Sequence, residues 1–219
     1  MTFFNTLCDQ TKTEQAFLLS APVIKDTFAG DITRARYQAF LGQAYHHVKH
    51  TVPLLMRAGS LLPNSLEWLR KAVVEYIEEE YGHECWILND LKATGADPEQ
   101  IKNAEPHWST DAMVSVVYDH MQRYHPAAFF GMAHVLEGTS VQLATQAAHK
   151  VQARLALPNS AFSYLLSHGD LDQDHVKFFE DLMNQLTDVE AQQAIIRTAR
   201  SVYHLYGEMF RAIPTLAGE

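Results

Sequence analysis

The chain has 219 residues, a formal net charge of −9 at pH 7 and a hydrophobic content of 47%. This hydrophobic content excludes an intrinsically disordered chain, and the acidic charge, without a long Lys and Arg cluster, argues against nucleic acid as the main partner. The length suits one well-packed domain over residues 1–219, and no run of about 18 apolar residues predicts a membrane-spanning segment.

The two cysteines and the N-terminal segment predict the cellular compartment of the protein. Cys8 and Cys85 are the only cysteines, and their spacing fits neither a disulfide framework nor a metal cluster, which indicates a reducing environment. The opening segment MTFFNTLCDQTKTEQAF has no basic region followed by a long apolar core, so it does not have the pattern of a signal peptide. We therefore expect a soluble, cytoplasmic protein.

Helical periodicity extends over almost the whole chain, and runs of alternating β-branched residues are missing. A first helix is expected at residues 3–20. A second begins near Asp31 or Thr33, is kinked by Pro53 and ends near Gly59.

The middle of the chain carries further helix boundaries. Asn64 and Glu67 form a capping box that opens a third helix, and Gly95 follows its end. A fourth helix begins at Ser109 and stops before the next proline. Residues 126–157 form a long fifth helix with that proline in its first turn.

The last helices are expected after a break near Gly169. Asp170 caps the next helix, and Thr187 and Glu190 form a capping box for the final one, which ends near Ile213. Seven or eight helices with short links predict an all-α bundle.

Carboxylate and imidazole side chains occur in two pairs at helical spacing. Glu80 and His83 are three residues apart in EEEYGHECW. Asp172 and His175 repeat this spacing in DQDHVKFF, and His168 lies one further turn back. Because residues three apart are neighbours on a helix, and bundles bind metals with inward carboxylates and imidazoles from several helices, these pairs are candidate metal ligands.

Glu137 is a third contributor. It is the one acidic residue in the long segment 126–157, and its neighbours are small or apolar. An ionised carboxylate in such surroundings is costly unless it is paired, coordinated or protonated. A metal and a single Arg would explain it equally well.

The segment YHHVKH offers a further imidazole. His47 lies beside Ala44 at the edge of the apolar stripe of its helix, whereas His46 and His50 are expected with Gln43 on the wetter side. His47 is therefore the better candidate for a side chain that points into the bundle.

These residues, in this order, resemble the haem-oxygenase-like all-α superfamily that includes TenA-type proteins, and within it the haem-oxygenase-like diiron oxidases and oxygenases. The resemblance extends from YHHVKHTVPLL through EEEYGHECWILNDL to the final helix, with Glu137 following His83 after 54 residues. The preceding helix commonly adds another Glu, where this chain has His46 or His47, and we take His47 as the added ligand. The resemblance implies two iron ions held by these side chains: Glu80, His83, Glu137, His168, Asp172 and His175.

The chemistry that the resemblance implies is activation of O₂ and oxidation of a small organic substrate. Oxygen and imidazole ligands suit Fe(II), and they suit Mn and Zn as well. Three carboxylates with a charge of −3 would nearly neutralise two ferrous ions with a charge of +4. The resemblance also suggests a homodimer, and Tyr203 and Tyr206 in the final helix are our candidates for substrate contacts.

Two other classes of function remain open. A metal-free TenA-type hydrolase of thiamin-like pyrimidines would need a nucleophilic Cys in mid-chain and a Glu in the last helix. Glu208 in YGEMFRAI matches the catalytic Glu, but residues 132–140 contain no Cys, and Ala or Gly cannot replace a thiol nucleophile. The other class is a non-catalytic helical binding protein whose pocket retains a metal.

Overall fold

The computed structural model describes the backbone of residues 1–169 and 173–219 and the side chains of residues 1–167 and 176–219. These residues form helices joined by short turns and no β-strand, which confirms the predicted all-α fold class. The α-helices are α1 Phe3–Leu19, α2 Pro22–Ala29, α3 Arg34–Val48, α4 Thr51–Leu61, α5 Glu67–Glu80, α6 His83–Ala93, α7 Pro98–Asn103, α8 Trp108–Arg123, α9 Phe129–Leu155, α10 Ser163–Gly169, α11 Gln173–Gln185 and α12 Val189–Leu216.

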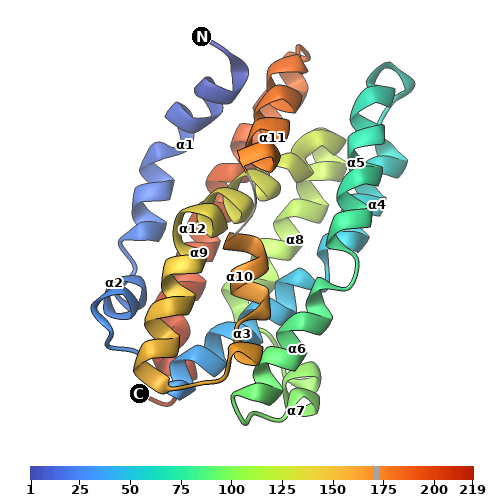
Figure 1. Cartoon of the computed structure of the whole chain (residues 1–219). Coiled ribbons are helices and arrows are strands. Elements are labelled where there is room, and N and C mark those ends of the chain that lie inside the picture. Colours follow the sequence, from blue (N-terminus) through green and yellow to red (C-terminus); the bar gives the residue numbers. More distant parts are fainter. Residues whose placement is uncertain (170–172) are drawn as a thin grey trace.

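The helices pack around one continuous cluster of buried apolar side chains. The long helix α12 contacts α1, α8 and α9, so it forms the centre of the bundle, and α9 contacts α10 on its other side. Figure 1 shows the N-terminus and the C-terminus at opposite ends of the molecule. No helix formed by the described residues is long and apolar enough to cross a lipid bilayer.

Two expected helices are each divided in two. The second breaks between Val48 and Thr51, so Pro53 lies in the first turn of α4, where the amide hydrogen that proline lacks is not needed. The expected kink at Pro53 is therefore a break that precedes it. The third helix breaks at Tyr81 and Gly82, where Gly82 adopts φ 93°, a conformation that side chains with a Cβ rarely reach.

Two of the predicted caps are wrong. Asn64 begins a short 3₁₀ turn, residues 64–66, and no side chain caps the start of α5. At α12 the cap is Asp188 rather than Thr187, and its carboxylate accepts hydrogen bonds from the amides of Glu190 and Ala191. Thr187 and Asp188 are both good cap residues, so the sequence pattern misplaces the cap by one position.

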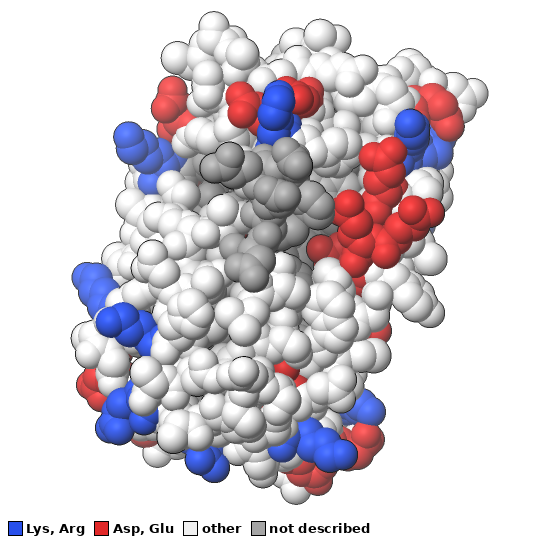
Figure 2. Space-filling model, in the orientation of Figure 1, with Lys and Arg blue, Asp and Glu red and all other residues white. Residues whose placement is uncertain are grey.

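The helix α5 presents acidic side chains at the surface. Glu78 and Glu79 are exposed. Figure 2 shows Asp and Glu side chains gathered over the part of the surface where Figure 1 shows α5. Glu80, the last residue of α5, is half-buried, so one carboxylate of this acidic run lies towards the interior.

Candidate metal centre and adjoining cavities

A cavity of about 50 Å³ lies where α3, α5, α9, α10 and α12 meet. Three of the residues predicted as metal ligands, His47, Glu80 and Glu137, line it together. They are separated by up to 90 residues of sequence, so only the packing of the helices brings them together. The polar side chains in the wall are His47, Thr51, Tyr76, Glu80, Glu137, Ser140, Tyr164 and Tyr206.

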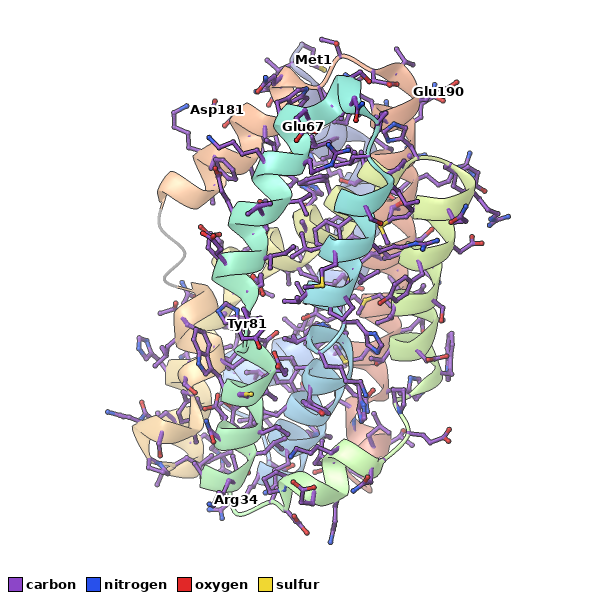
Figure 3. The ribbon with its side chains drawn as sticks, turned by 90° about the vertical axis from the view of Figure 1, so that its right-hand side faces the viewer. Met1, Arg34, Glu67, Tyr81, Asp181 and Glu190 are labelled. Carbon is purple, nitrogen blue, oxygen red and sulfur yellow. The ribbon has the colours of Figure 1, made fainter. Side chains whose placement is uncertain are left out.

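Glu80 and His83 form a direct contact across the break in the helix. His83 Nδ1 lies 3.1 Å from Glu80 Oε2, and the His83 ring stacks on Trp86 with centroids 4.0 Å apart. Figure 3 labels Tyr81 at the junction between the end of α5 and the start of α6. The prediction that both side chains share one helical face is wrong, because Gly82 turns the chain between them, yet the two side chains still meet.

Glu137 lies in the middle of α9, is half-buried and borders two cavities. Burial, and next the negative charge of Glu80, raise its pKa to about 8. The Tyr76 hydroxyl donates a long hydrogen bond of 3.5 Å to Glu137 Oε2. Among the described side chains no Lys or Arg forms an ion pair with Glu137, so the single-Arg explanation finds no support there.

The two neighbouring histidines of α3 have different surroundings. His47 borders the cavity, and its ring meets the Tyr206 ring edge-on at 5.7 Å. The expectation that His46 and Gln43 face water is wrong, because α8 covers this side of α3. Both are buried, and Gln43 Oε1 accepts hydrogen bonds from the His107 amide and the Thr110 hydroxyl.

His46 has the environment of a neutral imidazole. Burial, and then the charge of Lys49, lower its pKa to about 4, and its Nδ1 lies 3.4 Å from Lys49 Nζ. His46 is not in the wall of the cavity that His47, Glu80 and Glu137 line. Of the two histidines, His47 is therefore the one beside Glu80 and Glu137.

The other half of the predicted ligand set lies outside the described residues. Asp172 is not described, and nothing is described of the His168 and His175 side chains. Their helices are placed: α10 contains His168 and packs on α9, and α11 contains His175. In the part of the chain whose side chains are described, no group of three potential ligands is close enough to hold a metal.

Asp90 fastens α10 to α6. This fully buried carboxylate accepts hydrogen bonds from the amides of Ser163 and Tyr164, at 3.0 and 2.9 Å, and from the Ser163 hydroxyl. Those amides open α10, so Asp90 caps one helix from another. It thereby connects the helix that begins with His83 to the helix that contains His168.

Asp90→Ala is expected to lower the free energy of unfolding by about 2 kcal/mol, because the buried Tyr164 amide and the partly buried Ser163 amide lose their acceptor. Urea denaturation monitored by circular dichroism measures the loss. Asp90→Asn keeps one acceptor oxygen and should lose less than the alanine variant. Equal stability of Asp90→Ala and wild type would show that α10 does not depend on this cap.

A second cavity of about 180 Å³ lies on another side of Glu137. Tyr203, predicted to contact substrate, borders this cavity, whereas Tyr206 borders the smaller one. Burial lowers the pKa of His134 in its wall to about 4. Cys8 is also in the wall, and burial raises the pKa of its thiol, which disfavours the thiolate form that a nucleophile needs.

Glu208 is separate from these cavities. It is half-buried on α12 and is not in the wall of either cavity beside Glu137. Its negative charge acts on His107 instead. No thiol accompanies Glu208 in the way the hydrolase alternative requires, since Cys8 lies in the wall of a cavity that Glu208 does not border.

Four polar residues of the smaller cavity were not predicted as site residues: Thr51, Tyr76, Ser140 and Tyr164. The spacing of Tyr76 could have identified it, since it lies one helical turn before Glu80 and therefore on the same face of α5. The position of Tyr164 depends on the Asp90 cap at the start of α10.

The chain matches one family of known proteins. Residues 38–207 match the family described as iron-containing redox enzymes. No curated protein matches the chain.

Solved structures share the fold at low sequence identity. A protein of unknown function with a haem-oxygenase-like fold from Shewanella denitrificans aligns with TM-score 0.85 and 17% identity over 98% of this chain and 93% of that one. A TenA homologue from Pseudomonas syringae aligns with TM-score 0.80 and 11% identity over 97% and 93% of the two chains. Haem oxygenase from Leptospira interrogans aligns with TM-score 0.71 and 16% identity over 96% and 99%.

Proposed function

Because the chain belongs to the family of iron-containing redox enzymes, we propose that it is a non-haem iron oxidase or oxygenase. It uses O₂ to oxidise a small organic substrate held inside the helical bundle. Two iron ions bind the following side chains: Glu80, His83, Glu137, His168, Asp172 and His175, with His47 as an additional ligand.

The observation that carries this proposal is the environment of Glu137. It is a half-buried carboxylate at the wall of two cavities, close to a second carboxylate, Glu80, and no Lys or Arg among the described side chains forms an ion pair with it. Bringing two carboxylates together away from bulk water costs free energy that a divalent cation offsets. His47 on the same wall adds an imidazole, and this oxygen and nitrogen donor set suits Fe(II).

The protein groups around the proposed ligands have definable roles. The Glu80 contact at His83 Nδ1 would hold the orientation of that imidazole for metal binding. The Tyr76 hydroxyl holds the orientation of Glu137 through its hydrogen bond. Iron bound in this place would supply electrons for the reduction of O₂. The enclosing helices exclude bulk water, and Tyr206 orients the substrate.

The test of this function is iron content. Protein loaded anaerobically with Fe(II) and freed of unbound metal should retain about two irons per chain and give a transient visible absorption on admission of air. His175→Ala should retain less than half as much iron, with its helical circular dichroism unchanged. The matched control is His149→Ala, which removes an exposed imidazole from α9 and should retain iron as wild type does.

Three results would contradict the proposal. Full iron retention by His175→Ala would remove that residue from the ligand set. No iron in the wild type under any loading would exclude the oxidase, and hydrolysis of thiamin-like pyrimidines by wild type but not Glu208→Gln would then support the TenA-type alternative. A haem absorption spectrum in the purified protein would indicate haem in place of the two-iron site.

A further inference from the structure

A third cavity, of about 90 Å³, lies between α2, α3, α9, α10 and α12. Aliphatic and aromatic side chains make up most of its wall. Cavities with such walls bind apolar molecules readily. Its principal apolar lining residues are Val23, Ile24, Phe28, Phe40, Leu143 and Phe210.

This apolar cavity adjoins the cavity of the proposed metal centre. Ser140, Tyr164 and Tyr206 line both of them. A molecule that fills the apolar cavity therefore reaches these three residues at one end, and Glu137 and Glu80 lie in the same wall beyond them.

Tyr206 brings a hydroxyl group to this junction. The residue is 5% exposed and lies in the walls of both cavities, and burial raises the pKa of its hydroxyl, so the group is neutral at pH 7. A neutral tyrosine hydroxyl both donates and accepts hydrogen bonds. A ligand with a polar end at the junction would therefore find a hydrogen-bond partner in Tyr206.

The charged side chain in the wall of the apolar cavity indicates which charge the tail of a ligand there can carry. Arg36 is the one charged side chain of the apolar cavity among the described residues, and two carboxylates already occupy it. Its Nε lies 2.6 Å from Glu219 Oε2 and its Nη1 lies 3.3 Å from Asp26 Oδ2. The tail of a ligand in this cavity therefore needs no negative charge.

We propose that the apolar cavity binds the uncharged alkyl or aryl tail of the substrate and places its polar, reactive end beside Tyr206 at the metal centre. The substrate class is a small amphiphile with one hydrogen-bonding end and an apolar tail. The identification of this ligand as a substrate rests on the proposed function, whereas its binding does not require iron.

The probes are straight-chain primary alcohols from butanol to decanol, titrated calorimetrically into iron-free protein. Their dissociation constant should fall about fourfold for each added methylene, the ratio that corresponds to about 0.8 kcal/mol per buried CH₂. The fall should stop at the length that fills the cavity. Tyr206→Phe should weaken all the alcohols by a similar factor, about fivefold, because the hydrogen bond is to the shared hydroxyl end.

Two variants of α9 locate the binding place. Ala147 borders the cavity, so Ala147→Leu should shorten the longest alcohol that gains affinity. Gln146→Leu adds the same side chain next to it on the exposed surface and is the matched control, with no expected change. Leu143→Ala enlarges the cavity and should lengthen the preferred alcohol. Because the two variants are expected to change the preferred length in opposite directions, misfolding of one variant cannot explain both changes.

The two proposals fail separately. Affinity that is independent of chain length, or lengths that are unchanged in both Ala147→Leu and Leu143→Ala, would overturn the apolar-tail proposal and leave the iron measurement unaffected. Chain-length-dependent binding by a protein that takes up no iron would support the cavity assignment and overturn the oxidase.

Discussion

In the iron-free protein, Glu137→Gln is expected to raise the free energy of unfolding at pH 7 by up to about 3 kcal/mol. The native protein holds this carboxyl away from bulk water and beside Glu80, which raises its pKa to about 8. The unfolded chain lets the same group ionise at its ordinary value. Glutamine has a similar shape and no proton to lose, so the variant avoids the cost.

The pH dependence fixes the sign of this effect. Below the unfolded pKa, near 4.5, Glu137 is protonated in both states and the two proteins should be similarly stable. As pH rises from there to about 8, the unfolded state ionises first, so the native wild type loses stability relative to the variant. Above the pKa of Glu137 in the folded protein, the difference in free energy of unfolding between wild type and variant becomes constant. Urea titrations at several pH values measure this difference directly.

Iron should reverse the order of stability. With Fe(II) present, wild type gains the binding free energy of the metal, whereas Glu137→Gln has lost a ligand and should gain much less. Glu78→Gln is the matched control, since Glu78 is exposed on α5, and it should follow wild type in both conditions. An iron-free Glu137→Gln no more stable than wild type at pH 7 would mean that Glu137 is compensated in solution.

The sequence predicted the fold class because helical periodicity runs through almost every segment and is a local property. It also predicted that Glu80, Glu137 and His47 would face the interior, and all three line one cavity. These positions stand out locally, as a carboxylate in an apolar segment or an imidazole at the edge of an apolar stripe. The contribution of His168, Asp172 and His175 stays a prediction.

Features that depend on several helices could not be predicted in this way. Helical spacing implies an unbroken helix through Glu80 and His83, but Gly82 breaks it. His46 seemed to face water because the sequence does not show that α8 covers α3. The Asp90 cap joins residues 73 positions apart, and the apolar cavity is formed by five helices.

The helix α9 packs closely on α12 at Gly131. Among substitutions that add one methyl group where these two helices meet, Gly131→Ala is expected to be the most destabilising. A Cβ at Gly131 would lie 2.8 Å from the Ala199 amide nitrogen and closer still to the Ile195 carbonyl oxygen. Both are backbone atoms of α12, which cannot rotate away as a side chain can. Separating the helices should lower the free energy of unfolding by about 3 kcal/mol.

Gly138→Ala is the matched control, seven residues further along the same helix. A Cβ there meets nothing within 4 Å, so alanine should stabilise the helix by up to about 1 kcal/mol through its better propensity. The two alanine variants should therefore differ by about 4 kcal/mol in urea denaturation. Because α9 carries Glu137 and α12 carries Tyr206, Gly131→Ala should also weaken alcohol binding at their junction. Equal stability of the two variants would show that the helices lie further apart in solution.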